Sequence, residues 1–101
     1  MPKVNIDVPS TLNAQDTFTK IKTFFDESPD LRKFDPKMAC TFNDSQMSGV
    51  AKGDKFSADL KVNSSGSTAS VSIVLDLPLL LSPFKGQIKS TVEKKLNALL
   101  S

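Results

Sequence analysis

Few residues of this chain could take part in chemistry. Its 101 residues include one cysteine, Cys40, and no histidine. There is therefore no imidazole base, no Ser-His or Cys-His nucleophile pair and no histidine ligand for a metal. Carboxylates and lysines remain, but acid–base catalysis needs paired groups and none stands out. We expect no enzymatic activity, no metal and no cofactor. The acidic residues near turns or at outward strand positions are Asp44, Asp54, Asp59 and Asp76.

Cys40 alternates inward in a predicted strand and has no basic neighbour in sequence. We therefore expect an inert, buried thiol without an intrachain disulfide. The N-terminus lacks the apolar run of a signal peptide. The longest strongly apolar stretch, Val71–Leu81, is interrupted by polar residues and by proline, and it is far shorter than the roughly 20 residues of a membrane span. These features predict a cytoplasmic protein without a transmembrane segment.

The composition is that of a globular domain. Apolar residues make up 39% and charged residues 24% of the chain. This balance excludes an intrinsically disordered chain. Residues 1–101 fall near the commonest domain size, so we expect one domain. The 13 basic and 11 acidic residues give a net charge of +2, which by itself is too weak to predict binding to nucleic acid or to an anionic membrane.

The first quarter of the chain predicts a strand and then a helix. Apolar and polar residues alternate over Lys3–Val8, which indicates a half-buried strand that Pro9 would end. Ser10 or Thr11 could cap the helix that follows. The helix has one apolar face, stops near Ser28-Pro29, and is expected to be covered at its end by Leu31 and Phe34. Its apolar face consists of Ala14, Phe18, Ile21 and Phe25, widened by Phe24.

Four strands are predicted next, over residues 37–43, 46–52, 55–62 and 68–76. Each has one apolar and one polar face, which is typical of an antiparallel sheet. Gly49 hints at a bulge. Gly53-Asp54 could form a two-residue hairpin with glycine at its first central position.

The last segment predicts a long amphipathic helix. Ser82-Pro83 combines a capping hydroxyl with proline at the first helical position. Four lysines lie off the apolar face, where they could contact acidic lipid headgroups or simply face solvent. The apolar face consists of Phe84, Ile88, Val92, Leu96 and Leu99, and the lysines are Lys85, Lys89, Lys94 and Lys95.

This order, β-α-β-β-β-β-α, predicts an α+β fold in which an antiparallel sheet packs on a long C-terminal helix. The arrangement is that of a small helix-grip domain, which commonly encloses an apolar pocket between helix and sheet. Met and Phe side chains could line such a pocket or fill it as close-packed core. The candidate lining residues are Met38, Phe42, Met47, Phe56, Leu81, Phe84 and Ile88.

The segment Leu79–Ile88 reads Leu-Leu-Leu-Ser-Pro-Phe-Lys-Gly-Gln-Ile and leads into Val92 and Leu96. It resembles the ending of the small bacterial polyhydroxyalkanoic acid system proteins, in which a leucine-rich strand end runs into Pro-Phe/Leu-Lys/Arg-Gly-x-Ile and a basic amphipathic helix. The resemblance implies an association with polyester storage granules and a likeness to the lipid- and polyketide-binding helix-grip (START-like) superfamily. It implies no cofactor and no catalytic residue.

Two functions remain open at this point. The first is a non-enzymatic binding domain for an acyl or lipid-like apolar ligand, or for a polyhydroxyalkanoate granule surface. The second is a protein–protein interaction module, monomeric or weakly dimeric, that acts through a sheet edge or an apolar corner. Leu77–Leu81 would form that corner if these leucines are exposed, whereas they would otherwise complete the core.

Overall fold

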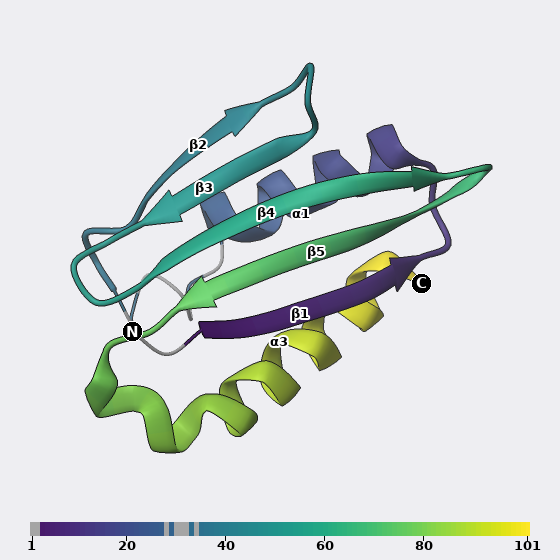
Figure 1. Cartoon of the computed structure of the whole chain (residues 1–101). Helices are drawn as coiled ribbons and strands as arrows, with labels where there is room; N and C mark the ends of the chain where they lie inside the picture. Colours follow the sequence, from purple (N-terminus) through teal and green to yellow (C-terminus); the bar gives the residue numbers. More distant parts are fainter. Residues whose placement is uncertain (1–2, 28, 30–32, 34) are drawn as a thin grey trace.

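The structure, a computed structural model, describes residues 3–27, 29, 33 and 35–101. The order of elements is the predicted one, with a 3₁₀ helix added before the last helix (Figure 1). The elements are β1 (Lys3–Ser10), α1 (Ala14–Glu27), β2 (Ala39–Asn43), β3 (Ser48–Lys52), β4 (Ser57–Ser65), β5 (Thr68–Asp76), the 3₁₀ helix η1 (Leu79–Phe84) and α3 (Lys85–Leu100).

The strands form one five-stranded antiparallel sheet in the order β1-β5-β4-β3-β2. Its two edges are β2 and β1, and the first strand of the chain pairs with the last. The register places the apolar residues of neighbouring strands on the same face, as in the pairs Ile6↔Ile73 and Leu60↔Ile73. This follows from the period-two alternation, because a shift by one residue would turn every buried side chain outward.

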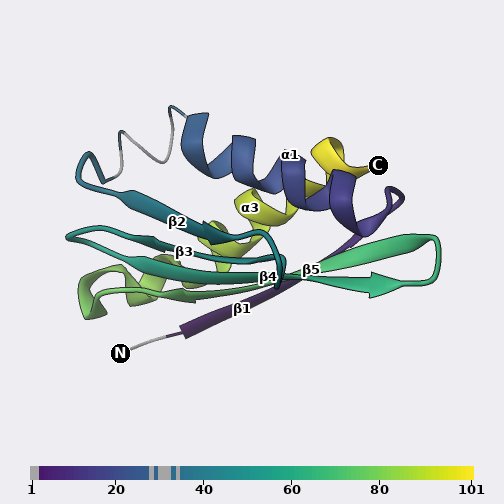
Figure 2. The same cartoon turned by 90° about the horizontal axis from the view of Figure 1, so that it is seen from above.

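Both helices lie on the apolar face of the sheet (Figure 2). Helix α1 packs over β4 and β5, and α3 runs along the edge strand β1 (Figure 1). The α+β helix-on-sheet prediction is confirmed. The core comprises Val4, Ile6, Val8, Phe18, Ile21, Phe25, Met38, Ala51, Phe56, Ala58, Leu60, Val62, Ala69, Val71, Ile73, Leu75, Leu77, Leu96 and Leu100.

The prediction that Pro9 ends the first strand is wrong. Strand β1 continues to Ser10, and Pro9 stands opposite Ser70. Proline has no N–H to donate, so it is tolerated in a strand whose other side has no partner strand. β1 is such an edge strand.

The start of α1 also differs from the prediction. The cap is Asn13, whose side-chain Oδ1 accepts a hydrogen bond of 2.8 Å from the backbone N–H of Asp16. Ser10 instead forms a buried hydroxyl pair with Thr17. Thr11 donates from its N–H and its hydroxyl to the carbonyl of Leu100. The predicted capping residue therefore satisfies the C-terminal end of α3.

The glycines of the hairpins have other roles than those predicted. Gly49 pairs in continuous register with both neighbouring strands and makes no bulge. A side chain at this position would overlap the ring of Phe42, which accounts for the glycine. The loop after β3 runs over residues 53–56, and φ is not positive at Gly53. The two-residue turn with glycine first lies at Gly66-Ser67, where φ of Gly66 is 64°.

Ser82-Pro83 does not cap the C-terminal helix. Pro78 is the residue just before η1, and its carbonyl accepts a hydrogen bond from the N–H of Leu81. Both predicted start residues lie inside that 3₁₀ helix, so α3 begins after Phe84 and without a side-chain cap.

The remaining expectations concern the end of α1 and the membrane. Helix α1 ends at Glu27, close to the predicted stop before Pro29. The expected covering residues, Leu31 and Phe34, lie outside the described residues. None of the helices in the described part of the chain combines the length and the apolar character needed to cross a bilayer.

Candidate functional site

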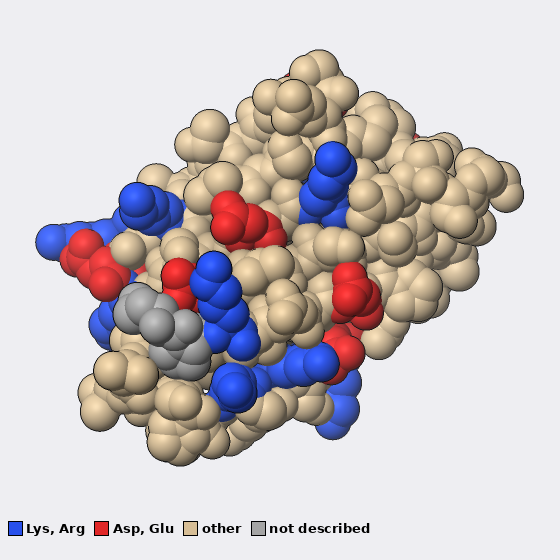
Figure 3. Space-filling model, viewed as in Figure 1, with Lys and Arg blue, Asp and Glu red and all other residues tan. Residues whose placement is uncertain are grey.

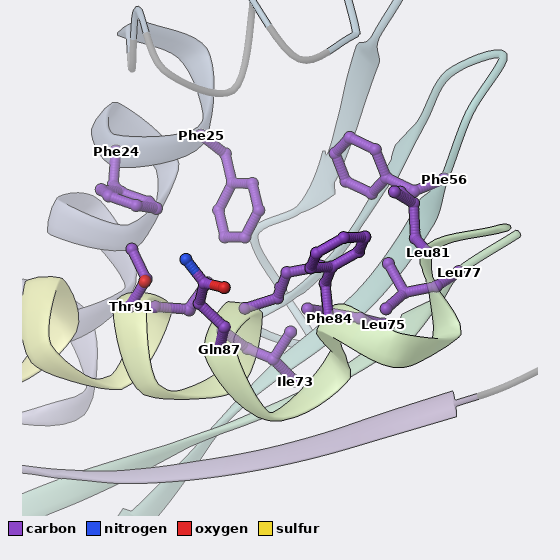
Figure 4. A pocket seen from close by; sticks show the side chains of 12 residues that line it. Phe24, Phe25, Phe56, Ile73, Leu75, Leu77, Leu81, Phe84, Gln87 and Thr91 are labelled. Carbon is purple, nitrogen blue, oxygen red and sulfur yellow. The ribbon is translucent and has the colours of Figure 1, made fainter.

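A cavity of about 350 Å³ lies between the two helices, η1 and the sheet (Figure 4). Its lining residues place it towards the end of the molecule where β5 leaves the sheet and α3 begins. Its volume falls at the lower end of the range of about 300–1,000 Å³ for small-molecule sites. The lining residues are Phe24, Phe25, Phe56, Ile73, Leu75, Leu77, Leu81, Phe84, Gln87, Ile88, Thr91 and Val92.

The floor of the cavity is the sheet, and one wall is the last turn of α1. Ile73 and Leu75 face inward from β5 because strand residues two apart share a face. Phe24 and Phe25 meet edge to face, with ring centroids 5.4 Å apart and an interplanar angle of 88°. Such pairs are favourable for aromatic quadrupoles and fix both rings.

The geometry of η1 supplies the outer wall. Side chains three residues apart eclipse one another in a 3₁₀ helix. Leu81 and Phe84 therefore lie on one side of η1, and both line the cavity. Phe84 is 52% exposed, which places its ring at the opening.

Helix α3 packs tightly against the sheet only in its C-terminal half. Its fully buried residues, Leu96 and Leu100, lie in its C-terminal half. Ile88 and Val92 in the N-terminal half are only half-buried, and they face the cavity. The apolar stripe thus packs on the sheet at one end of the helix and leaves a void at the other.

Polar groups enter the lining at two positions, both on α3. Gln87 and Thr91 are one helical turn apart and carry an amide and a hydroxyl (Figure 4). Among the residues that the structure describes, none with an ionisable side chain lines the cavity. This lining can hold an apolar body and offer neutral hydrogen bonds at the opening.

Four of the residues predicted from sequence to line a pocket lie around this cavity: Phe56, Leu81, Phe84 and Ile88. The other three lie elsewhere. Met38 is buried in the core, and Met47 is half-buried in the turn before β3, where its φ is 50°. Phe42 packs edge to face on Phe18, with centroids 6.2 Å apart.

Sequence reasoning missed the aromatic pair of α1 and the inward residues of β5 as cavity residues. Phe24, Phe25, Ile73 and Leu75 were predicted to face the core, which they do. For the two aromatic residues, the signal that could have indicated a cavity is the pair of adjacent phenylalanines at the end of an amphipathic helix. One of the two lies off the centre of the stripe and must fill space beside it.

A buried carboxylate that the sequence did not single out positions one wall. Asp35 accepts hydrogen bonds from the backbone N–H of Lys55 (2.7 Å) and of Lys37 (3.3 Å). The Lys55 N–H is the main reason that the pKa of Asp35 lies below its ordinary value of 3.8, although burial opposes the shift. Gly53 leaves room for the carboxylate, since any side chain there would overlap it. Asp35 thereby fixes the loop that ends in Phe56.

The other groups that could do chemistry, as far as the described residues go, do not line the cavity. Cys40 is half-buried, and its Sγ donates to the carbonyl of Phe25 at 3.8 Å. Asp44 and Asp54 form exposed ion pairs with Lys22 and Lys37. Within the described ranges, no three His, Cys, Asp or Glu residues gather as they would around a metal ion.

The apolar corner predicted at Leu77–Leu81 divides into core, cavity lining and surface. Leu77 is 1% exposed and belongs to the core, whereas Leu81 faces the cavity. Leu79 and Leu80 are 75% and 85% exposed. The four lysines of α3 all lie on exposed positions.

Comparisons by sequence identify no family. No family model matches the chain, and no curated protein matches it significantly. The resemblance of Leu79–Ile88 to the polyhydroxyalkanoic acid system proteins therefore stays a prediction.

Several solved structures have a similar fold. TTHA0849 from Thermus thermophilus aligns over 98% of this chain and 92% of its own, with a TM-score of 0.60 and 9% identity. Ara h 8.0201 aligns over 98% and 97%, with a TM-score of 0.57 and 10% identity. BexL, a di-domain ARO/CYC of the BE-7585A biosynthetic pathway, aligns over 99% of this chain and 45% of its own, with a TM-score of 0.63 and 11% identity. At these identities the comparison shows the fold alone, and the chain has the α+β helix-grip fold.

Proposed function

We propose that this chain is a non-enzymatic binding domain that holds an acyl or similar lipid-like ligand between α3 and the sheet. The observation that carries the proposal is the apolar cavity of about 350 Å³ at the N-terminal half of α3. Apolar lining with a few placed polar groups is the usual chemistry of a small-molecule site. The described lining has no group that could transfer a proton at neutral pH, which supports binding without catalysis, although one protein of this fold is named as an ARO/CYC.

The size of the cavity limits the ligand. At roughly 30 Å³ per non-hydrogen atom, the space that a molecule of liquid water takes, it holds at most about twelve such atoms. A medium-length acyl chain meets this limit. Its polar end would lie at the opening beside Gln87 and Thr91, where a hydroxyl or carbonyl would find a partner.

The biological setting follows from the resemblance. We propose that the chain is a single helix-grip domain of the polyhydroxyalkanoic acid system, acting in the bacterial cytoplasm at or near storage granules. The supporting observations are the segment Leu79–Ile88 and the helix-grip fold. An acyl ligand suits a system that builds polyesters from hydroxyacyl units.

The test is a titration with 1-naphthylamine, a neutral polarity-sensitive dye that is small enough for this limit and whose emission changes in dry surroundings, followed by displacement with decan-1-ol. We expect saturable binding that decan-1-ol competes away. Ile88→Trp fills the cavity and should reduce dye affinity by at least tenfold. Ser90→Trp, on an exposed position of the same helix, is the matched control and should bind as the unchanged chain does. Equal binding by both variants would contradict the proposal.

A further inference from the structure

The surface outside the cavity carries a second feature, an exposed apolar corner made of Leu79, Leu80 and Phe84. These side chains are 75%, 85% and 52% exposed. They lie on η1, which forms one end of the molecule at the lower left of Figure 1. Apart from Val50 in β3, they are the exposed large apolar residues of the described chain. Such a cluster on one turn marks an interaction surface.

The corner cannot be absorbed into the core without unwinding η1. In a 3₁₀ helix residues three apart form rows. Leu81 and Phe84 belong to the row that faces the cavity, and Leu77 before the helix is already buried. Leu79 and Leu80 begin the other two rows, which point away from the cavity. Filling the cavity with a ligand would therefore leave these two leucines exposed.

Basic side chains stand beside the corner. Lys85 directly follows Phe84, and Lys89 lies one helical turn further along α3; both are exposed, and neither belongs to the ion pairs among the described residues. Figure 3 shows this end of the molecule as tan surface with blue side chains next to it. Lys3, at the start of β1, is the register partner of Asp76 on β5. Asp76 comes three residues before Leu79, so Lys3 lies at the same end of the sheet as the corner. Negative charge on α3 begins only at Glu93.

We propose that the corner inserts into the surface of an anionic lipid bilayer, with Lys85 and Lys89 at the lipid phosphates. Exposed leucines and a phenylalanine flanked by lysines are the chemistry of an interfacial membrane anchor. A protein partner of ordinary affinity would need about 800 Å² on this side, far more than three side chains on one short helix provide. Phe84 belongs to both the corner and the cavity opening, so docking brings that opening to the lipid.

Vesicle cosedimentation tests this proposal. The chain should bind mixed vesicles that contain equal parts of phosphatidylcholine and phosphatidylglycerol. It should bind vesicles of pure phosphatidylcholine at least tenfold more weakly. Leu79→Ser with Leu80→Ser should reduce the partition coefficient by at least tenfold. Lys85→Gln with Lys89→Gln should reduce it by about 25-fold on the anionic vesicles, since each lysine contributes about a fivefold factor. Val50→Ser, which removes an exposed apolar side chain from the sheet, is the matched control and should have no effect.

Two outcomes would overturn the proposal. One is unchanged vesicle binding by the leucine double variant, with its thermal unfolding also unchanged, as expected for exposed side chains. The other is a concentration-dependent dimer in sedimentation velocity that the same variant abolishes while vesicles bind nothing, which would assign the corner to a second copy of the chain. The dye titration separates this test from that of the cavity. The leucine variant should keep dye binding, and Ile88→Trp should keep vesicle binding.

Discussion

At the scale of single residues, Asp35 shows how a carboxylate can shape a binding site without contacting the ligand. It receives backbone N–H groups from the loop that carries Phe56, and it lies against Gly53. The folded state therefore favours the ionised form, and the pKa of Asp35 lies below 3.8. Breaking these hydrogen bonds would release the loop and, with it, one wall of the cavity.

The first prediction concerns pH. Because the folded pKa of Asp35 is lowered, its contribution to stability is complete above about pH 5 and is lost as the pH falls through 3.8 towards the folded value. Asp35→Asn should therefore lower the midpoint of thermal unfolding at pH 7, and the gap from the unchanged chain should shrink towards about pH 3. Thermal melts of both proteins across this range provide the measurement. A gap that is constant or grows on acidification would contradict the assigned role.

The second prediction compares two glycines. Gly53→Ala should cost about 1–3 kcal/mol, because the new methyl group overlaps a carboxylate that hydrogen bonds hold in place. Gly86→Ala should stabilise by up to about 1 kcal/mol, since the position is helical with open space around it. Urea denaturation measures both. If the two substitutions have the same effect, Gly53 is not sterically constrained.

At the scale of elements, the two halves of α3 differ in what they pack against. The half that holds Leu96 and Leu100 is sealed against the sheet, and its last carbonyl is capped by Thr11. The half that holds Ile88 and Val92 borders the cavity. Apolar residues spaced four and three apart along the whole segment predict the helix, but they do not indicate which part of the helix packs against the sheet.

The third prediction follows from this division. Leu96→Ala should cost about 2–5 kcal/mol, as for a fully buried leucine. Ile88→Ala should cost only about 1 kcal/mol, because its side chain is half-exposed and alanine favours the helix. Chemical denaturation of both variants is the measurement. Equal losses would mean that the N-terminal half is packed as closely as the C-terminal half.

The elements themselves were largely readable from the sequence. Strand alternation and the helical stripes predict the order, the faces and the antiparallel sheet, because each pattern has one geometric solution. The predicted boundaries of the elements were wrong where the position of a residue in the fold overrode its local sequence preference. Pro9 is accommodated by an edge position, and Ser82-Pro83 lies inside a 3₁₀ helix that starts at Leu79. Neither circumstance is visible in the residues themselves.

At the scale of the whole molecule, the cavity arises from how the elements meet. The sheet, the end of α1, η1 and the start of α3 surround space that no side chain occupies. Phe56, Leu81, Phe84 and Ile88 could be proposed from sequence because they are large apolar residues on the inward face of a predicted strand or at the last helix. Met38 and Phe42 met the same description but fall in filled regions, since which part of a core is filled depends on distances between elements.

The fourth prediction concerns ligand and stability together. A ligand that binds only the folded chain and is present at ten times its Kd adds about 1.4 kcal/mol to stability. For a domain of this length we expect decan-1-ol at that level to raise the unfolding midpoint by about 5–10 °C. Ile88→Trp should abolish the increase, and Ser90→Trp should retain it. An increase that survives in Ile88→Trp would place the ligand outside the cavity.

The central claim is that the space beneath the first turns of α3 takes up an apolar molecule. Its most direct test is a methyl NMR titration of the labelled chain with decan-1-ol. We predict saturable shifts at Ile73, Leu75, Leu81 and Ile88, while the methyl groups of Val62 and Ala69, further along the sheet in the filled core, stay in place. Resonances around the cavity that remain unmoved at saturating alcohol, or shifts spread evenly over the surface, would contradict it.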